Sequence, residues 1–363
     1  MKMNWKAMSG IALCALWLLL AAAVWFWPST EVSDTERREL AQFPDLSAKT
    51  LLDGTFMEDF ESYTLDQFPL RDGFRSLKAR VHYGVLRQKD NHGIYLSQGY
   101  AAQLEYPLNE ASVSHGLQVF EDVYHRYLQD SRVFFSVIPD KSYYLAQNGG
   151  YPSMDYDALF QKVQDGAPYA SYVNLTDTLS AEDYYRTDTH WRQERLTGVT
   201  DRLCSALEIS TPQNLRETQV ERSFYGVYYG QAALPMEPDI LSYLQSPVID
   251  GCRVYHYETD SYQPVYDLKK LEGKDLYEVF LSGPVSLLRI ENPQGPKGKE
   301  LILFRDSYGS SLAPLLVQGY ESITLVDLRY VSSKMLDRFL DFHGQDVLFL
   351  YSTIVLNNSF QIK

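Results

Sequence analysis

The sequence predicts a three-layer α/β fold built around a mostly parallel central β-sheet and preceded by one apolar helix. Three continuous apolar runs, at 133–138, 301–304 and 347–350, are typical of strands buried on both faces of a parallel sheet. Segments with helical spacing of apolar residues separate them, which is the alternation found in α/β proteins. We expect an extended and helical lead-in over 31–90 and the α/β domain over 91–363.

Residues 1–30 are predicted to be a short cytoplasmic stub and a transmembrane anchor. No charged residue occurs from Ala7 to Thr30. A helix over 7–27 would be roughly 31 Å long, which matches a hydrocarbon core of about 30 Å. Lys2 and Lys6 precede this run and acidic residues follow it. Positive charge is kept on the cytoplasmic side, so the rest of the chain is expected to be extracytoplasmic on a single-pass membrane protein.

Aromatic residues occur at both ends of the apolar run. Trp5, Trp25 and Trp27 stand where an interfacial belt would lie. The alternative is a cleaved signal peptide, with small residues for cleavage at 21–23. The apolar run continues beyond these positions to Trp27, which favours an uncleaved anchor.

Composition and charge narrow the classes of function. Hydrophobic residues make up 45% and charged residues 22%, which indicates a globular body. The formal net charge of −14 argues against nucleic acid and against tight binding to an anionic bilayer surface. A neutral polymer is the easier substrate, unless a local basic groove overrides the total. The 28 tyrosines suit either sugar-binding surfaces or the edges of the core.

The three cysteines have no metal-ligand spacing, and neither a metal site nor a cofactor is expected. Cys14 lies in the apolar segment. Cys204 and Cys252 are expected to be two buried thiols, and a disulfide between them outside the cytoplasm is the alternative.

The individual elements follow from spacing and from turn residues. Helices are expected over 51–63, 72–86, 113–128, 155–164 and 191–207, and from Ser307 toward Val317. Strands are expected over 94–96, 133–138, 172–175, 301–304, 323–326 and 347–350. The region 211–290, rich in Tyr and Gly, is expected to hold short strands and turns.

Ser307 is the candidate nucleophile. It follows the buried strand 301–304 and begins a helix, and open α/β sheets bind ligands at the carboxyl ends of their strands. The first amides of the helix can hold an oxyanion, and Gly309 permits a sharp turn beside them. The alternative is that Ser307 merely caps the helix.

A candidate base lies in the segment Thr187-Asp188-Thr189-His190-Trp191. Serine needs a base to take its proton, and histidine has a suitable pKa. Asp188 stands two positions before His190, so in an extended segment the two side chains share a face and can bond. The alternative is that Asp188 caps a helix beginning near Trp191 and that His190 is an ordinary surface residue.

Together the two motifs resemble the DHHW proteins and the alginate O-acetyltransferases of the AlgJ and AlgX type. Their Asp-x-His-Trp motif is present at 188–191 and is followed by an Asp-Ser-Tyr-Gly turn at 306–309. The similarity spans roughly 35 to 357. Further matching blocks are Glu36–Leu40, Phe43-Pro44, Asp66–Pro69 with Arg71, Ile138–Lys141, Phe224–Gly226, Tyr277–Gly283 and Asp327–Tyr330.

The resemblance implies an SGNH hydrolase-like fold with permuted order, in which the Asp and His of the triad precede the Ser. Carried over by position, it implies that Ser307 is the nucleophile, His190 the general base and Asp188 the residue that orients His190.

The resemblance also implies oxyanion and substrate contacts. The amides of Ser307 and Tyr308, with Gly283, are the expected oxyanion donors, and Lys141, Arg329 and Tyr330 the expected substrate contacts. Family members often have Gly-Asn where this chain has Gly283-Pro284, so a side-chain oxyanion donor is not expected here. For Arg329 and Tyr330 the alternative is packing beside the strand 323–326.

Two functions of different class follow. The first is an extracytoplasmic serine esterase or O-acetyltransferase that acts on a cell-surface polysaccharide through an acyl-enzyme, with a membrane-bound O-acyltransferase partner supplying acetyl groups. The second is a catalytically silent carbohydrate-binding or scaffold protein of an envelope polysaccharide assembly. The Gly283-Pro284 departure and the acidic charge favour the second function, and the joint presence of Ser307, His190 and Asp188 favours the first.

Overall fold

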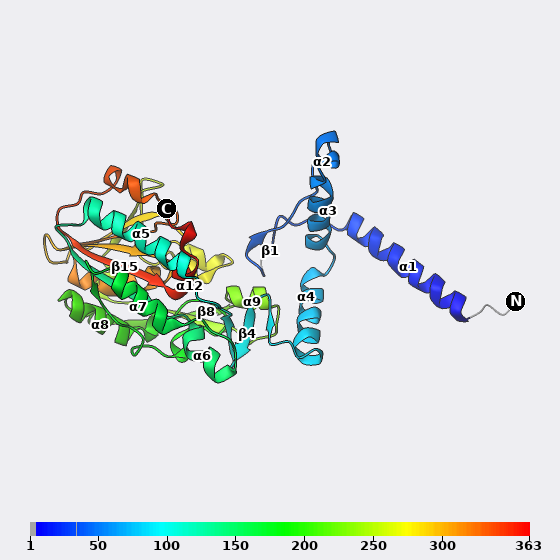
Figure 1. The fold of residues 1–363 in the computed structure, drawn as a ribbon, viewed down its shortest axis with the longest axis horizontal. Coiled ribbons are helices and arrows are strands. Elements are labelled where there is room, and N and C mark those ends of the chain that lie inside the picture. Colours follow the sequence, from blue (N-terminus) through cyan, green and yellow to red (C-terminus); the bar gives the residue numbers. More distant parts are fainter. Residues whose placement is uncertain (1–4, 34) are drawn as a thin grey trace. The chain divides into compact units, whose positions relative to one another are not determined.

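A computed structural model of the protein describes residues 5–33 and 35–363 (Figure 1). It divides into two compact units. The first runs to Asn91 and includes 233–235, and the second comprises 92–232 and 236–363. Each unit is described by itself below.

The first unit contains the apolar helix α1 (Trp5–Phe26). Its residues Met8–Phe26 are long and apolar enough to cross a membrane or to act as a signal sequence. Lys2 and Asp34, two of the charges that flank the apolar run, lie outside the described residues.

The remainder of the first unit is a small helical assembly. Its elements are β1 (Val32–Ser33), β2 (Arg38–Glu39), α2 (Ala48–Leu52), α3 (Thr55–Asp66), α4 (Arg71–Arg80), the π-helical turn η1 (Val81–Val85) and β3 (Asp90–Asn91). The helix predicted over 51–63 is divided between α2 and α3, because Gly54 adopts a left-handed φ of 86° between them. The helix predicted over 72–86 corresponds to α4 and η1.

An eight-stranded sheet forms the centre of the second unit, in the order β11-β10-β12-β14-β13-β15-β6-β7. The five strands from β14 to β7 are parallel, and β12, β10 and β11 add an antiparallel edge. The strands are β6 (Arg132–Ile138), β7 (Ser171–Tyr172), β10 (Arg253–His256), β11 (Ser261–Gln263), β12 (Leu287–Glu291), β13 (Glu300–Arg305), β14 (Ser322–Val326) and β15 (Asp346–Ser352).

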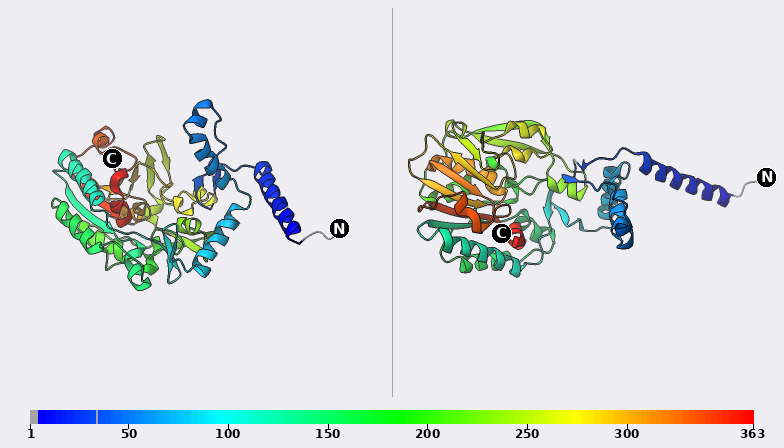
Figure 2. Two further views of the ribbon diagram at one scale, coloured as in Figure 1. Left: turned by 45° about the vertical axis from the view of Figure 1, so that its right-hand side comes forward. Right: turned by 90° about the horizontal axis from the view of Figure 1, so that it is seen from above.

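Helices cover both faces of this sheet (Figure 2). Successive residues of β13 alternate between two cores, as the pleat of a strand requires. Leu301 and Leu303 pack with α8 (Thr197–Leu207) and α11 (Tyr308–Leu316). Ile302 and Phe304 pack with α5 (Glu110–Tyr127), α7 (Tyr156–Gly166) and α12 (Thr353–Asn357). The predicted three-layer α/β fold with a mostly parallel sheet is therefore confirmed.

Smaller elements complete the second unit. They are the hairpin β4 (Ile94–Ser97) and β5 (Tyr100–Gln103), the antiparallel pair β8 (Arg216–Phe224) and β9 (Asp239–Gln245), and the helices α6 (Lys141–Gly149), α9 (Val227–Ala232) and α10 (Pro247–Asp250). Cys204 and Cys252 are free, buried thiols, as predicted.

The predicted start of one helix is wrong. The helix expected from Trp191 begins only at Thr197. Trp191 instead forms an antiparallel bridge with Tyr184, and a 3-10 turn at 193–195 follows. The apolar spacing that suggested a helix arises because the Trp191 side chain is buried from an extended segment.

Candidate active site

Ser307, His190 and Asp188 lie in a hydrogen-bonded row. Ser307 stands between the end of β13 and the start of α11, and its side chain makes no capping bond to the helix. Its Oγ is 2.7 Å from Nε2 of His190, and Nδ1 of that ring is 2.6 Å from Oδ1 of Asp188. The alternative in which Ser307 serves only as a helix cap is therefore wrong. The structure brings together the three residues that the motifs had singled out.

The surroundings of Asp188 favour one of the two tautomers of His190. The Asp188 side chain is 1% exposed, and its second oxygen accepts the amide of Val227 at 2.9 Å. A buried carboxylate beside Nδ1 favours the ring form that donates from Nδ1. Nε2 is then left as an acceptor for the Ser307 hydroxyl, which is the arrangement that a general base requires.

Hydrogen bonds to Asp239 and from Gly226 hold the segment that precedes His190. Asp239, the first residue of β9, accepts the amides of Arg186 and Thr187, each at 2.8 Å. The Thr187 hydroxyl in turn accepts the amide of Gly226 at 2.9 Å. These bonds fix a bend at 186–190, not the extended segment that was expected, and within this bend the Asp188 side chain also accepts the His190 amide at 3.0 Å.

The two motifs also bind each other directly. The Tyr308 hydroxyl donates to the carbonyl of Thr189 at 2.6 Å. The Trp191 indole donates to the Ser311 hydroxyl at 2.9 Å and to the Tyr308 carbonyl at 3.2 Å. Trp191 is fully buried, so its packing on the start of α11 sets the distance between His190 and Ser307.

Tyr277 is a site residue whose role the sequence reasoning missed. Its ring stacks on the His190 imidazole with 3.8 Å between centroids and 8° between planes. Its hydroxyl is 2.8 Å from the Ser311 hydroxyl, and burial raises the pKa of Tyr277 well above its ordinary value. The stacked ring restrains the imidazole and shields one face from water. Tyr277 belonged to a matching block, but nothing in the sequence indicated its contact with His190.

A pocket of about 210 Å³ opens beside Ser307 and His190. It is smaller than the roughly 300–1,000 Å³ typical of sites for drug-sized ligands, so it suits a small acyl group. Predicted residues in its lining are Ser307, His190, Gly283, Arg329 and Tyr330, and they are joined by Asp275, Tyr277, Glu278, Phe280, Pro284, Arg305 and Ser310.

Two arginines of the pocket share one carboxylate. Arg329 makes a bidentate pair with Asp327 at 2.9 and 2.6 Å, and Arg305 approaches the same carboxylate at 3.5 Å. Burial lowers the pKa of Arg305, whose Nε has no hydrogen-bond partner among the described residues. The acidic lining residues are engaged elsewhere, Glu278 with Lys270 and Asp275 with the Tyr277 amide. Two guanidinium groups of the pocket therefore share the Asp327 carboxylate, and Asp306 is also close enough to influence both.

Two of the expected oxyanion donors are already occupied. The Tyr308 amide donates to Oδ1 of Asp306 at 3.0 Å, and the Gly283 amide donates to the Phe280 carbonyl at 3.3 Å. Asp306 also accepts the Ser352 amide at 2.8 Å, so it ties the nucleophile turn to the end of β15. The Ser307 amide has no acceptor within the part of the chain that the structure describes. Of the three predicted donors, it is the one left available.

Lys141 does not line the pocket, which corrects the expectation that it contacts substrate. Its side chain is 2% exposed and donates to the carbonyl of Tyr185 at 2.7 Å. Its amine also lies 5.0 Å from the centre of the Tyr228 ring. Burial lowers the pKa of Lys141 to about 7. Lys141 thus supports the backbone that leads to Asp188.

No protein-family model matches the sequence, and no curated protein matches it. Several solved structures share the fold. A DHHW family protein from Eubacterium siraeum aligns with a TM-score of 0.60 at 18% identity, over 75% of this chain and 95% of that one. Bacillus cereus PatB1 aligns with a TM-score of 0.53 at 14% identity, over 72% and 96%.

A second PatB1 structure, with a sulfonyl adduct, aligns equally well, with a TM-score of 0.53 at 15% identity over 72% and 95%. The O-acetyltransferase domain of Pseudomonas putida AlgJ aligns at 12% identity over 73% and 92%, but its TM-score of 0.46 is too low to carry weight. The resemblance to DHHW proteins stated from the motifs is thus confirmed for the fold.

Gly226 tests how closely Asp188 is packed. A Cβ added at Gly226 would lie 2.2 Å from Cβ and 2.4 Å from Cα of Asp188, so any side chain must displace Asp188. We expect Gly226→Ala to lower kcat/KM on an acetyl ester on the order of 100-fold, the usual cost of a 1 Å misplacement. Gly84→Ala, where a Cβ meets nothing within 4 Å, is the matched control. Unchanged turnover in Gly226→Ala would contradict the packing.

The stacking role of Tyr277 predicts different effects for two substitutions. Tyr277→Phe keeps the ring over His190 and should retain most activity. Tyr277→Leu removes the ring pair, worth about 0.5–1.5 kcal/mol, and should lower kcat by about 2- to 13-fold. Steady-state kinetics separate this from substrate binding, because KM should change little. A larger loss in Tyr277→Phe than in Tyr277→Leu would exclude the stacking role.

Lys141 should make stability depend on pH. Its folded pKa of about 7 lies below the ordinary 10.5, so between these values the unfolded chain binds the additional proton. The free energy of unfolding therefore gains a contribution that rises from pH 7 toward pH 10. We expect Lys141→Met to flatten this rise in urea unfolding at pH 7, 8.5 and 10. Lys269→Met, at an exposed lysine, should leave it unchanged; equal slopes in both variants would refute the assignment.

Proposed function

We propose that this chain is an extracytoplasmic serine O-acetyltransferase or esterase that acts on a cell-surface polysaccharide through an acetyl-enzyme. The row from Ser307 through His190 to Asp188, at the mouth of a small pocket, is the observation that carries the proposal. Binding alone requires no such row, so the catalytic function is favoured over a silent scaffold. The proposed fold type is SGNH-like with permuted order, since Asp188 and His190 precede Ser307 in the chain.

The first half-reaction would form the acetyl-enzyme. Ser307 Oγ attacks the carbonyl carbon of an acetyl ester while its proton passes to Nε2 of His190. Asp188 stabilises the imidazolium that results. When the tetrahedral intermediate collapses, the ester bond breaks and the leaving oxygen takes the proton from His190. The products are acetyl-Ser307 and the free alcohol of the donor.

The second half-reaction would transfer the acetyl group. His190 takes the proton of an acceptor hydroxyl, whose oxygen attacks the carbonyl carbon of acetyl-Ser307. The tetrahedral intermediate then collapses, the bond from the acetyl carbon to Ser307 Oγ breaks, and Oγ takes the proton from His190. A sugar hydroxyl as acceptor makes the chain a transferase, and water makes it an esterase. Resemblance to alginate O-acetyltransferases favours the sugar. It also favours a membrane-bound O-acyltransferase partner as the source of the acetyl group.

Developing negative charge needs a donor at the carbonyl oxygen. We assign this role to the Ser307 amide, because the Tyr308 and Gly283 amides are engaged. The positive charge of Arg305 and Arg329 lies at the same pocket and would act over a short distance in a partly buried site. Tyr330, 55% exposed at the pocket rim, offers a ring on which an acceptor sugar can stack.

Substitution of the triad tests the proposal. With a chromogenic acetyl ester, Ser307→Ala and Asp188→Asn should each lose on the order of 10⁴-fold in kcat. Ser114→Ala, at an exposed serine of α5, is the control and should retain full activity. A sulfonyl fluoride should label wild-type Ser307, detected by mass spectrometry, and should not label Ser307→Ala at any other serine.

Equal turnover by wild type and Ser307→Ala would show that Ser307 is not the nucleophile and would refute the proposed triad. Polysaccharide binding that persists in Ser307→Ala, with no turnover in the parent, would establish the scaffold function instead.

A further inference from the structure

Helix α4 and its π-helical continuation η1 present their apolar face to the outside. Leu70, Phe74, Leu77, Val81 and Val85 recur at intervals of three and four residues, so they form one stripe. All five are exposed, by 71, 50, 57, 39 and 72%. A helix on the surface of a soluble domain normally turns such a stripe toward the core.

The opposite side of α4 is charged and faces the rest of the unit. Arg71 bonds the Glu36 carboxylate, and Arg75 pairs with Glu36 at 3.1 Å. Arg71 also reaches Asp66 at 3.2 Å, and Ala79 on this side is fully buried. The unit therefore fixes α4 with the ion pairs inward and leaves the apolar stripe uncovered.

Cations border the stripe on both sides. Lys78 and Arg80 are exposed. Because an α-helix turns by about 100° per residue, these two residues lie on either side of the stripe. Between 71 and 89 the chain has six Lys or Arg and one Asp, in a protein of net charge −14. A central apolar stripe with flanking Lys and Arg is the pattern of helices that lie in a membrane interface.

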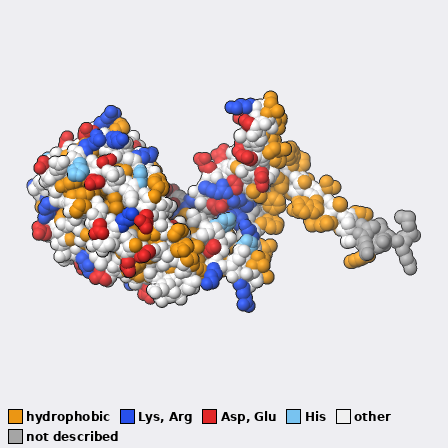
Figure 3. Space-filling model, viewed as in Figure 1, with side chains coloured by type: hydrophobic (Ala, Val, Ile, Leu, Met, Phe, Trp, Pro, Cys, Tyr) orange, Lys and Arg blue, Asp and Glu red, His pale blue; other side chains and the backbone are white. Residues whose placement is uncertain are grey.

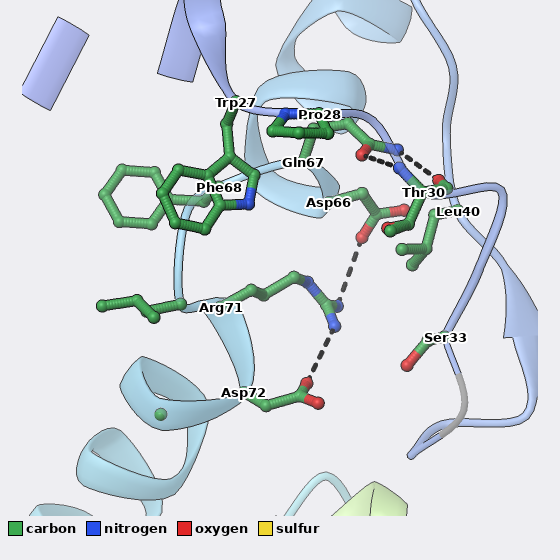
Figure 4. A pocket seen from close by; sticks show the side chains of 12 residues that line it. Trp27, Pro28, Thr30, Ser33, Leu40, Asp66, Gln67, Phe68, Arg71 and Asp72 are labelled. Carbon is green, nitrogen blue, oxygen red and sulfur yellow. Dashed lines mark hydrogen bonds and ion pairs between the residues drawn. The ribbon is translucent and has the colours of Figure 1, made fainter. Parts of the chain in front are cut away.

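The start of α4 lies against the end of the apolar helix α1. Trp27 and Pro28, just beyond α1, line the same pocket as Phe68, Leu70 and Arg71 (Figure 4). Trp25 also contacts Phe43 with ring centroids 6.4 Å apart. If α1 spans the bilayer, its end lies at the interface, and the stripe begins at the same level.

Further exposed apolar side chains belong to the same unit. Figure 3 shows hydrophobic side chains gathered along one side of α2, α3 and α4. Those on and beside α2 and α3 are Leu46, Leu51, Leu52, Met57 and Leu65. A continuous patch of this kind, next to a membrane-spanning helix, is the surface expected of a unit that rests on lipid.

We propose that α4 and η1 lie in the outer interface of the bilayer, with the stripe of Leu70, Phe74, Leu77, Val81 and Val85 in the acyl region and Lys78 and Arg80 at the anionic headgroups. The inference rests on the proposed membrane location of α1. The total charge of the chain points the other way, but charges beyond about 8 Å are largely screened at physiological salt, so the local cations decide. Interfacial α4 would hold the unit beside the membrane from which acetyl groups are proposed to come.

Site-directed spin labelling of the full-length chain in nanodiscs tests the proposal. The nanodiscs contain phosphatidylcholine and phosphatidylglycerol, and a nitroxide is attached at Phe74→Cys or Leu77→Cys with Cys14→Ser. The control on the opposite side of α4 is Asp72→Cys. Native Cys14, labelled in the wild type, reports separately on α1; Cys204 and Cys252 are buried. Acetyl-ester turnover of each labelled variant verifies that the second unit is intact.

Oxygen concentrates in lipid, and a nickel chelate stays in water. We expect the ratio of oxygen to nickel accessibility at positions 74 and 77 to exceed that at 72 several-fold and to approach that at 14. High nickel accessibility at 74 and 77, with Cys14 in lipid, would overturn the inference and leave the anchor intact. Low accessibility to both reagents would overturn it in favour of cover by protein, either the second unit or a second copy. Nickel access at Cys14 would overturn the membrane location and the inference together, while leaving the triad untouched.

Discussion

The structure of the site depends on the packing of Trp191 against the first turn of α11. Ser307 and His190 are separated by 117 positions in the chain, so their 2.7 Å contact cannot arise locally. The Trp191 indole bonds Ser311 and the Tyr308 carbonyl, and the Tyr308 hydroxyl returns a bond to Thr189. Each motif thereby supplies the buried partners of the other. A shift of either motif would lengthen the hydrogen bond between Ser307 and His190.

The strands of the fold could be predicted from local sequence, whereas the proximity of Ser307, His190 and Asp188 could be predicted only from the two motifs together and their resemblance to a family. Strands buried on both faces are continuous apolar runs. Asp188 and His190 contact each other as expected, but from a bend and not from extended backbone. Tyr277 and Lys141 left no mark in the local sequence. Their roles depend on where the chain carries them, since an aromatic ring or an amine can face a pocket, a carbonyl or water. The apolar spacing that begins at Trp191 suggested a helix for the same reason, although the backbone there is bridged to Tyr184.

The net charge of the chain is likewise a poor guide to its function. The total of −14 describes the chain as a whole, whereas function depends on charge at short range. At the pocket, Arg305 and Arg329 share Asp327. On α4, paired arginines face inward and Lys78 and Arg80 face outward. Neither arrangement can be obtained from a composition, because both depend on which side of a helix or strand end is covered.

The position of the Asp188–His190 pair has a consequence for how the proposed activity would be lost. Both residues stand on the short bend at 186–190, between the bridged residues Tyr184 and Trp191, whereas Ser307 is attached to the central sheet through β13. Local opening of that segment would withdraw the base and its carboxylate together and leave an unassisted serine behind. Conformations in which His190 stays beside Ser307 while Asp188 is displaced would be rare. A small local rearrangement of this segment would therefore stop the proposed turnover, while the sheet and its two hydrophobic cores stay folded.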